Sequence, residues 1–182
     1  MLVTGATGGV GSAAVAIASA QGYAVAAVTG KAAAHAWLRQ LGAGTVLARD
    51  ELSPAGDSKP LRKQLWAGAI DPVGGAALPA LLGSLRYGGA VALSGLTGGA
   101  EFAATVFPFI LRGVSLLGID SVYCPQPLRR ELWQLLAADW KPQRSELLLD
   151  RELGLDELPQ AFRSLLQGEA RGRMLLRLSG DD

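Results

Sequence analysis

The stretch Met1-Leu-Val-Thr-Gly-Ala-Thr-Gly-Gly-Val-Gly11 decides the fold. It opens with a short apolar run that favours a β-strand, and its glycine cluster leads into Ser12–Gln21, a run of small residues typical of a helix. A glycine-rich loop between a strand and a helix is the setting that a dinucleotide-binding fingerprint requires. The G-x-G-x-x-G register of that fingerprint falls on Ala6, Gly8 and Gly11, so alanine stands in place of the first glycine.

The remaining residues of this loop each have a physical task in that hypothesis. Gly8 lets the backbone approach a pyrophosphate, and Gly11 lets the helix pack closely on the strand. The amides of Gly9 and Val10, at the N-terminus of the helix, are expected to hold the anion. The alternative is an ordinary tight turn between a strand and a helix, but the further glycines and the flanking periodicity favour the phosphate loop.

Strand and helix patterns alternate along the rest of the chain, except that residues 50–63 are polar and interrupted by two prolines. The expected strands are Leu2–Thr4, Tyr23–Val28, Thr45–Ala48, Trp66–Asp71, Ala90–Ser94, Val114–Ile119 and Arg173–Leu178. The expected helices are Ser12–Gln21, Lys31–Leu41, Ala76–Leu85, Leu128–Ala138 and Leu155–Leu166. This alternation predicts an α/β fold with a doubly wound parallel sheet, the Rossmann fold.

The composition sets the class of protein. A chain of 182 residues has the length of one domain, and 49% apolar against 18% charged residues exclude a disordered chain. Because 17 Lys and Arg balance 16 Asp and Glu, no surface for nucleic acid is expected. One Cys and one His can form neither a disulfide nor an all-Cys/His structural zinc site within the chain. No apolar run is long enough to span a membrane, so we expect a soluble, cytoplasmic protein without a metal site.

The end of the second expected strand selects the nucleotide. An Asp or Glu about 20 residues beyond the loop binds the ribose 2′-hydroxyl of NAD, and this chain has no acid there. Thr29, Gly30 and Lys31 offer instead a hydroxyl, an open backbone and an ammonium, which suit the 2′-phosphate of NADP. A cation that opens a helix is unfavourable for the helix dipole, which favours a phosphate contact for Lys31 over the alternative of a solvated lysine.

Arg49 ends the third expected strand and can reach the same edge of the adenosine, or else it is an ordinary exposed loop arginine. A weaker alternative for the whole loop is a site for S-adenosylmethionine or a mononucleotide. The basic turn at Thr29–Lys31 argues against that alternative, because those ligands usually take an acid on the ribose.

No catalytic group of residues is visible. His35 stands alone in an alanine-rich segment, and Cys124 has no neighbouring His or cation to stabilise a thiolate. The Tyr-x-x-x-Lys pair of the short-chain dehydrogenases is absent. The strand ends at Val73–Gly75 and Gly95–Leu96 leave mostly backbone to line a nicotinamide ribose, or they serve as turns only.

Three stretches together resemble a known family: Leu2–Gly11, Thr29–Lys31 and Pro108–Val122. They are similar to the zinc-independent acrylyl-CoA reductase branch, quinone-oxidoreductase-like, of the medium-chain dehydrogenase/reductases, and the similarity extends to Arg171–Arg173. The resemblance implies an NADPH-dependent enoyl reductase that transfers a hydride to an acyl-CoA enoyl thioester. Family members carry a GroES-like catalytic domain ahead of the nucleotide-binding domain, and Met1 falls inside the first Rossmann strand, so we expect that domain to be missing here.

By the same resemblance, the family's nucleotide contacts fall on three groups of residues. These are Thr7, Gly8, Gly9 and Val10 for the pyrophosphate, Thr29, Gly30, Lys31 and Arg49 for the 2′-phosphate, and Leu96, Ile110 and Ser121 near the nicotinamide. Asp71-Pro72 departs from the Asp-Thr expected after the fourth strand, and this departure predicts a different loop below the nicotinamide ribose. The family's substrate-side residues belong mostly to the catalytic domain, so no catalytic residue is assigned.

The resemblance also implies a division of the chain. Residues 1–142 form the NADP-binding Rossmann domain, and residues 143–182 form a C-terminal segment that packs with the catalytic domain. Without that domain, residues 146–151 and 173–178 are expected to be displaced, self-paired or engaged in a dimer, because exposed strand edges pair readily. The edge strand Val114–Ile119 is where family members join, which predicts a homodimer.

Two functions remain open at this point. The first is the NADPH-binding domain of an acrylyl-CoA-reductase-like enzyme, inactive by itself. The second is a free-standing NADPH-binding module with a regulatory or interaction role and no catalysis. The exact enoyl substrate does not follow from a cofactor-binding fold.

Overall fold

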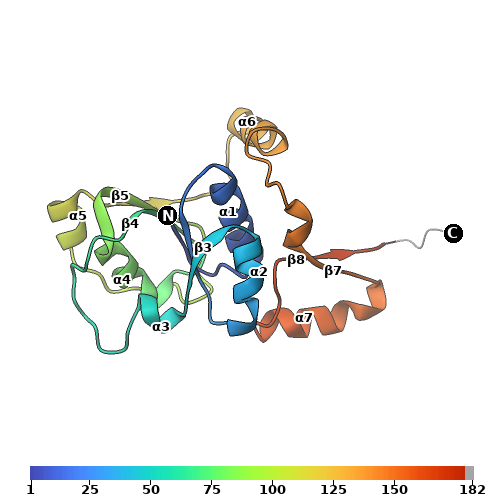
Figure 1. Cartoon of the computed structure of the whole chain (residues 1–182), viewed down its shortest axis with the longest axis horizontal. Coiled ribbons are helices and arrows are strands. Elements are labelled where there is room, and N and C mark those ends of the chain that lie inside the picture. Colours follow the sequence, from blue (N-terminus) through green and yellow to red (C-terminus); the bar gives the residue numbers. More distant parts are fainter. Residues whose placement is uncertain (179–182) are drawn as a thin grey trace.

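The computed structural model describes residues 1–178 and contains a six-stranded sheet with the strand order β3-β2-β1-β4-β5-β6 (Figure 1). Its strands are β1 (Leu2–Val3), β2 (Val25–Val28), β3 (Ala43–Leu47), β4 (Trp66–Asp71), β5 (Leu85–Leu93) and β6 (Ser115–Gly118). The helices around them are α1 (Gly9–Ala20), η1 (Ala32–Ala34), α2 (His35–Gln40), α3 (Arg49–Leu52), η2 (Gly75–Ala77), α4 (Leu78–Gly83) and α5 (Phe107–Arg112). All neighbouring strands in this sheet are parallel, which confirms the predicted doubly wound Rossmann fold.

Each face of the sheet has its own apolar core, because successive residues of a strand point to opposite sides. In β1, Val3 packs with α1 and α2, whereas Leu2 packs with α3 and α4. The four residues of β2 divide between the two cores in the same way, and all four are buried. Helices therefore cover both faces (Figure 1), and the strands read as continuous apolar runs for that reason.

Two of the boundaries that differ from the sequence prediction lie on either side of Ser84. The helix expected to reach Leu85 ends at Gly83, and β5 begins at Leu85 rather than at Ala90. Gly88 lies inside this strand with a φ of 71°, and the register between β4 and β5 shifts beside it. The pairing of the two strands is irregular at this point, and glycine tolerates the positive φ there. The sequence pattern predicts neither α3 nor α5, because 4 and 6 residues are too few to show a helical period.

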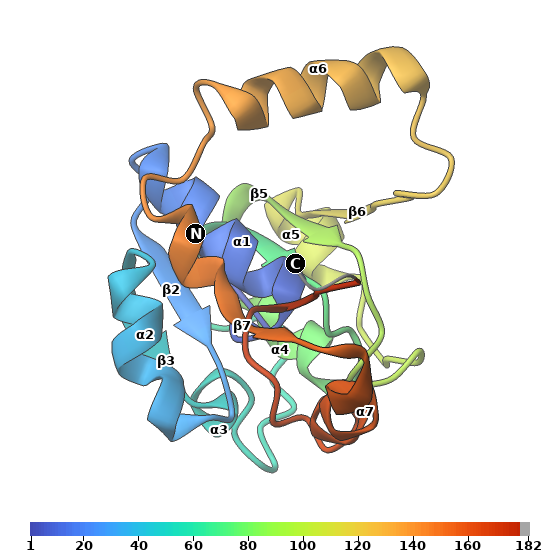
Figure 2. The same cartoon turned by 90° about the vertical axis from the view of Figure 1, so that its right-hand side faces the viewer.

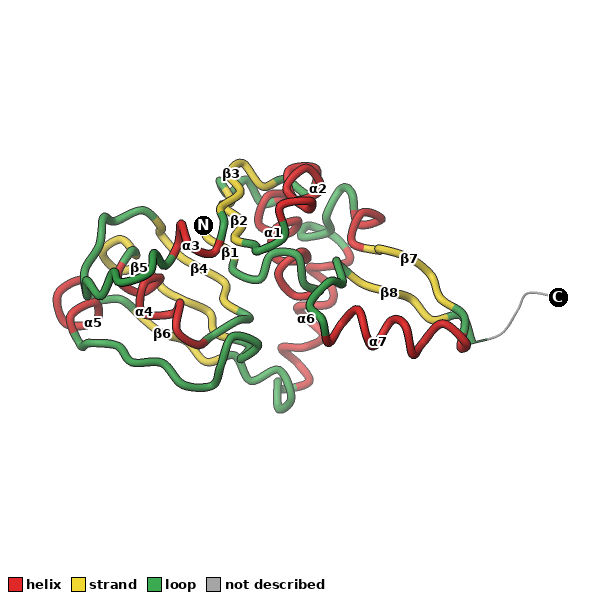
Figure 3. Tube along the Cα trace, turned by 90° about the horizontal axis from the view of Figure 1, so that it is seen from below, coloured by secondary structure: helices red, strands yellow, loops and turns green. Residues whose placement is uncertain are grey.

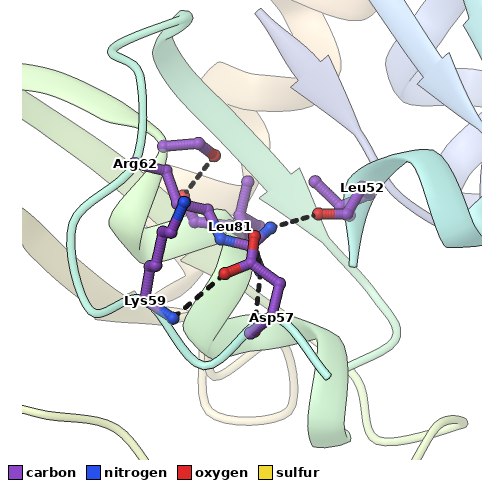
Figure 4. A network of polar contacts seen from close by, with 6 residues as sticks. Leu52, Asp57, Lys59, Arg62 and Leu81 are labelled. Atoms are coloured by element: carbon purple, nitrogen blue, oxygen red, sulfur yellow. Dashed lines mark hydrogen bonds and ion pairs between the residues drawn. The ribbon is translucent and has the colours of Figure 1, made fainter. Parts of the chain in front are cut away.

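Arg62 orders the polar segment between α3 and β4 (Figure 4). Its guanidinium donates to the carbonyl oxygens of Leu52 at 2.7 Å and Asp57 at 3.1 Å, and it pairs with the Asp57 carboxylate at 3.2 Å. That carboxylate also accepts the Lys59 amide. The Arg62 amide donates to the Gly83 carbonyl at 2.8 Å. A single arginine thus fastens the loop to the end of α4.

The C-terminal region, residues 126–178, projects from the body of the fold (Figures 1 and 3). It contains α6 (Gln126–Ala137), η3 (Ser145–Leu148), β7 (Leu149–Leu153), η4 (Leu155–Glu157), α7 (Leu158–Leu166) and β8 (Arg173–Leu176). β7 and β8 pair in parallel as a separate two-stranded sheet, so the two segments expected to lack partners are self-paired. α6 lies outside the layers, joined by a loop at each end (Figure 2), and has no buried residue.

Candidate functional site: a dinucleotide-binding crevice

The phosphate loop, Thr4–Gly11, turns directly from β1 into α1. Gly5 makes the turn with a φ of 52°. A Cβ at Gly11 would overlap the Gly5 carbonyl and the Ala6 backbone, so α1 packs on the loop as closely as the fingerprint predicts. α1 begins without a side-chain cap and without an acid in its first turn. Its amide donors and the positive end of its dipole therefore suit an anion.

The residues predicted to hold the pyrophosphate come together at this helix end. Gly8 is the N-cap of α1, and Gly9 and Val10 form its first turn. Thr7 is buried, and its hydroxyl oxygen lies 3.3 Å from that of Thr29. The loop is thereby joined to the end of β2, where the 2′-phosphate residues were predicted.

Arg173, at the start of β8, lies against the same loop. A Cβ at Gly9 would overlap the Arg173 guanidinium. A cation at the N-terminus of a helix is unfavourable for the helix dipole, so this placement calls for an anion beside them. The sequence analysis did not name Arg173 among the expected nucleotide contacts, although the family resemblance extends to it, because it lies at the other end of the chain from Gly9.

Thr29, Gly30 and Lys31 follow β2 as predicted, and Arg49 extends over them from the start of α3. A Cβ at Gly30 would lie 3.0 Å from Cζ of Arg49, so the missing side chain makes room for the guanidinium. Thr29 Oγ1 accepts the Lys31 amide at 3.1 Å. The structure therefore brings all four predicted 2′-phosphate residues to one place.

The pKa of Lys31 responds to one neighbouring cation and two neighbouring acids. Burial first, and the Arg49 cation second, lower the pKa of Lys31, while Asp150 and Glu169 act in the opposite direction. Two cations held near each other repel, and a dianion placed between them reverses the sign of that interaction. Charge-assisted hydrogen bonds from an ammonium and a guanidinium are among the stronger contacts that a phosphate can receive.

The turn formed by residues 168–173, between α7 and β8, closes this side of the crevice. The Lys31 ammonium donates to the Ala170 carbonyl oxygen. The Gly172 amide donates to the Thr7 carbonyl oxygen at 2.9 Å. One turn of the C-terminal region therefore touches both the predicted 2′-phosphate residues and the phosphate loop.

The switch point of the sheet, between β1 and β4, is held by a buried carboxylate. Asp71 is 2% exposed and accepts the Thr4 hydroxyl. It also accepts the amides of Val73 at 3.0 Å and Gly74 at 3.2 Å. Pro72, where the sequence departs from the family pattern, leaves these bonds intact because its neighbours supply the donors. Asp71 thereby fixes the loop at the crevice where ligands bind in such sheets.

An open cavity of about 520 Å³ lies beyond the ends of β4, β5 and β6. Glycine backbone and apolar side chains form most of its wall, including Leu96 and Phe102. Of the three residues predicted near the nicotinamide, Leu96 lines the cavity, and Ser121 follows directly after the lining residue Asp120. Ile110 is 68% exposed on α5 and is not part of the wall.

Among residues 1–178, the structure shows no group of three or more His, Cys, Asp or Glu side chains that could hold a metal ion. His35 begins α2, and Cys124 is a free thiol in the loop before α6. Within the same residues, no helix combines the length and the apolar character needed to cross a membrane.

Residues 9–138 match the zinc-binding dehydrogenase family. The chain belongs to that family. The match runs from the start of α1 to just beyond α6, and it confirms the resemblance to the medium-chain dehydrogenase/reductases. For the zinc of the family name, residues 1–178 offer no cluster of ligands, and the whole sequence has one Cys and one His.

Individual relatives share most of this chain. Acrylyl-CoA reductase AcuI of Ruegeria pomeroyi is 46% identical over 176 residues, which are 97% of this chain and 53% of that protein. The crystal structure of Bacillus subtilis yhfP with NAD bound superposes with a TM-score of 0.92 at 52% identity, covering 97% of this chain and 54% of the other. The crystal structure of Escherichia coli K-12 YhdH with bound NADPH superposes with a TM-score of 0.91 at 44% identity, covering 98% of this chain and 54% of the other. The chain thus spans about half the length of the relatives it matches.

Proposed function

We propose that this chain is the NADPH-binding part of an oxidoreductase that reduces an enoyl thioester of the acrylyl-CoA kind. The observation that carries the proposal is the placement of three cations along the crevice, one of them over the uncapped N-terminus of α1. Lys31 and Arg49 lie at the end of β2, and Arg173 lies over Gly9. Such an arrangement suits a ligand with two separate phosphate groups, as NADPH has.

Each part of the crevice then has a role in binding. The amides of Gly9 and Val10, with Arg173, hold the pyrophosphate, and Lys31 and Arg49 hold the 2′-phosphate. The cavity beside Leu96 receives the nicotinamide. The chemistry that NADPH supplies when bound is hydride transfer, here to the β-carbon of the enoyl thioester. The chain's own residues bind and orient, so we expect the chain alone to bind NADPH without appreciable acrylyl-CoA-dependent oxidation of it.

The substrate class is supported by the relatives rather than by a residue of this chain. Acrylyl-CoA reductase AcuI matches almost the whole chain, but the match covers only about half of that protein. We propose that residues 143–182, which follow the Rossmann domain 1–142, pack in the complete enzyme against the part this chain does not contain.

A homodimer through the edge strand β6 completes the proposal. Within residues 1–178, β6 pairs on one side only, with β5, and its other edge offers unpaired backbone groups. Sedimentation at micromolar concentration should therefore show a dimer, and a chain that stays monomeric throughout would contradict this part.

The experiment that tests the proposal is a calorimetric titration of the chain with NADPH and with NADH at two salt concentrations. We expect NADPH to bind at least roughly tenfold more tightly than NADH. Added salt should weaken the binding of NADPH more than the binding of NADH, because only NADPH has the 2′-phosphate. Lys31→Ala should remove most of this preference for NADPH and leave the affinity for NADH unchanged. Lys59→Ala, which removes a cation from the loop anchored by Arg62, is the matched control and should change neither. Equal binding of the two nucleotides, or binding of neither, would contradict the proposal.

A further inference from the structure

The side chain of Lys31 does not stand free in solvent. Its ammonium donates to the Ala170 carbonyl oxygen, so one of its three donors is held by the turn 168–173. The other two donors are left for a ligand. A free lysine side chain loses much of its rotamer entropy when it binds a phosphate. A lysine that is already held in place loses less of this entropy on binding.

The turn that holds Lys31 is itself clamped by Arg171. The Arg171 guanidinium donates twice to one Asp150 carboxylate oxygen, at 3.1 and 2.9 Å. Its Cζ lies 5.0 Å from the centroid of the Trp37 ring, in a cation–π contact. Trp37 is in turn fixed by its indole nitrogen, which donates to the Leu147 carbonyl at 2.9 Å. The clamp therefore joins β7 and η3 to α2 of the Rossmann body.

The backbone of the turn leaves little freedom either. Gly172 has a φ of 56°, and a Cβ there would overlap the Leu148 carbonyl. Its amide is bonded to Thr7 in the phosphate loop. Ala170 is thus placed by the contacts of the two residues that follow it, Arg171 and Gly172.

We propose that the turn 168–173 is a specificity element of the cofactor site: it holds the Lys31 ammonium at the Ala170 carbonyl, where it faces the 2′-phosphate, and thereby sets the preference for NADPH over NADH. This inference rests on the proposed function. Arg171 is a positioning residue in it, since its side chain acts on Ala170 and Lys31 through the turn.

The test measures the ratio of the NADH and NADPH dissociation constants by calorimetry on the full chain. Four proteins are compared: the unmodified chain, Arg171→Ala, Lys31→Ala and the double variant. Arg171→Ala should lower the ratio about three- to tenfold, the range for losing the pre-ordering of one long side chain. In the Lys31→Ala background, the same change should leave the ratio as it is, because the residue through which the turn acts is gone.

Two further variants separate the effect from general damage. Gly172→Ala moves the turn more severely and should lower the ratio at least as much as Arg171→Ala. Arg177→Ala removes an exposed arginine paired with Glu152 at 2.7 Å and should leave the ratio unchanged. Should Gly172→Ala fail to fold, Arg171→Ala, whose side chain is 41% exposed, still decides the question.

The contrary outcomes are equally defined. A ratio that Arg171→Ala leaves unchanged or raises would overturn the inference, as would an equal fall in both backgrounds. In those cases the unmodified chain still prefers NADPH, and the proposed function stands. An unmodified chain that binds neither nucleotide, or both equally, would overturn the proposed function together with this inference.

Discussion

The Rossmann body and the C-terminal region are stabilised in different ways. The body carries an apolar core on each face of its sheet. Of the buried apolar side chains, only Leu153 and Ala161 belong to residues 126–178. That region is attached instead by polar contacts, such as the hydrogen bond from the Gly172 amide to the Thr7 carbonyl oxygen, and by two leucines of η3 that pack on the α1–α2 core. Stability thus resides in one region, while the other contributes individual contacts to the cofactor site.

The difference is sharpest between α4 and α6, which are both rich in leucine. In α4, Leu78, Leu81 and Leu82 are buried in the core on the face of the sheet that α3 and α4 cover. In α6, no residue is buried, and Trp133 is 65% exposed. An apolar pattern shows that a helix has an apolar face, but the packing partner decides what burial that face contributes.

The largest effect is expected for Leu82→Ala in the body. The substitution removes fully buried apolar volume from the core between the sheet and helices α3 and α4. This loss costs about 2–5 kcal/mol of unfolding free energy. Urea unfolding followed by circular dichroism measures it. A loss of unfolding free energy under about 1 kcal/mol would show that the core collapses around the substitution. It would contradict the difference in stability described between the body and the C-terminal region.

Arg173→Ala is expected to give the next largest effect, on binding rather than on stability. The guanidinium lies against the first turn of α1, and losing a charged hydrogen bond to the pyrophosphate costs about 1.5–3 kcal/mol, or roughly 10- to 150-fold in affinity. Calorimetry should show this loss for NADPH and NADH alike, with little change in the thermal midpoint. An unchanged affinity for both nucleotides would mean that the C-terminal region contributes no phosphate contact.

A smaller effect is expected when pH is varied across the titration of Lys31. Burial and Arg49 lower the pKa of Lys31 below the usual 10.5, so the free chain loses this charge earlier than an exposed lysine would. The preference for NADPH should therefore fall as pH rises through that lowered pKa, and Lys31→Ala should abolish the dependence. Between the lowered pKa of the folded chain and 10.5, the unfolded chain still holds the Lys31 proton that the folded chain has released. The contribution of Lys31 to the free energy of unfolding therefore rises with pH in this window. A preference that is constant up to 10.5 would contradict the assignment.

The smallest effect is expected for Leu128→Ala on α6. Leu128 is 46% exposed and lies on a helix without buried residues, so the unfolding free energy should change by no more than about 0.5 kcal/mol. The same urea series that includes Leu82→Ala provides the measurement. A cost comparable to that of Leu82→Ala would show that α6 is packed in solution and that the two regions do not differ as described.

Most of the fold was predictable because it depends on local patterns. β4 occupies the predicted residues, and the glycine loop identified the strand and helix on either side of it. Gly88 misled the prediction of β5, since a glycine pair marks a bulge and a turn equally well until the partner strand is known. Short elements such as α3 depend on tertiary contacts and leave no period in the sequence.

The candidate site was predictable where its residues adjoin a strand end. Thr29–Lys31 follow β2 directly, and Arg49 follows β3, so strand order alone brings them together. Arg173 and Ala170 were not predictable in this way, because they reach the loop through the path of the C-terminal region. That path depends on a handful of specific contacts, and a single sequence carries no periodic signal for those.

The strand order also divides the sheet into two halves, each continuous in sequence: β1–β3 and β4–β6. The seam between them is narrow, since β1 has 2 residues and pairs with β4 only through Leu2 with Ala69 and Val3 with Ile70. The phosphate loop belongs to one half and the 520 Å³ cavity to the other. A dinucleotide bound across the crevice therefore acts as a tether over the seam. Its binding free energy adds to the cohesion of the two halves, so that the sheet comes apart less readily when the ligand is present.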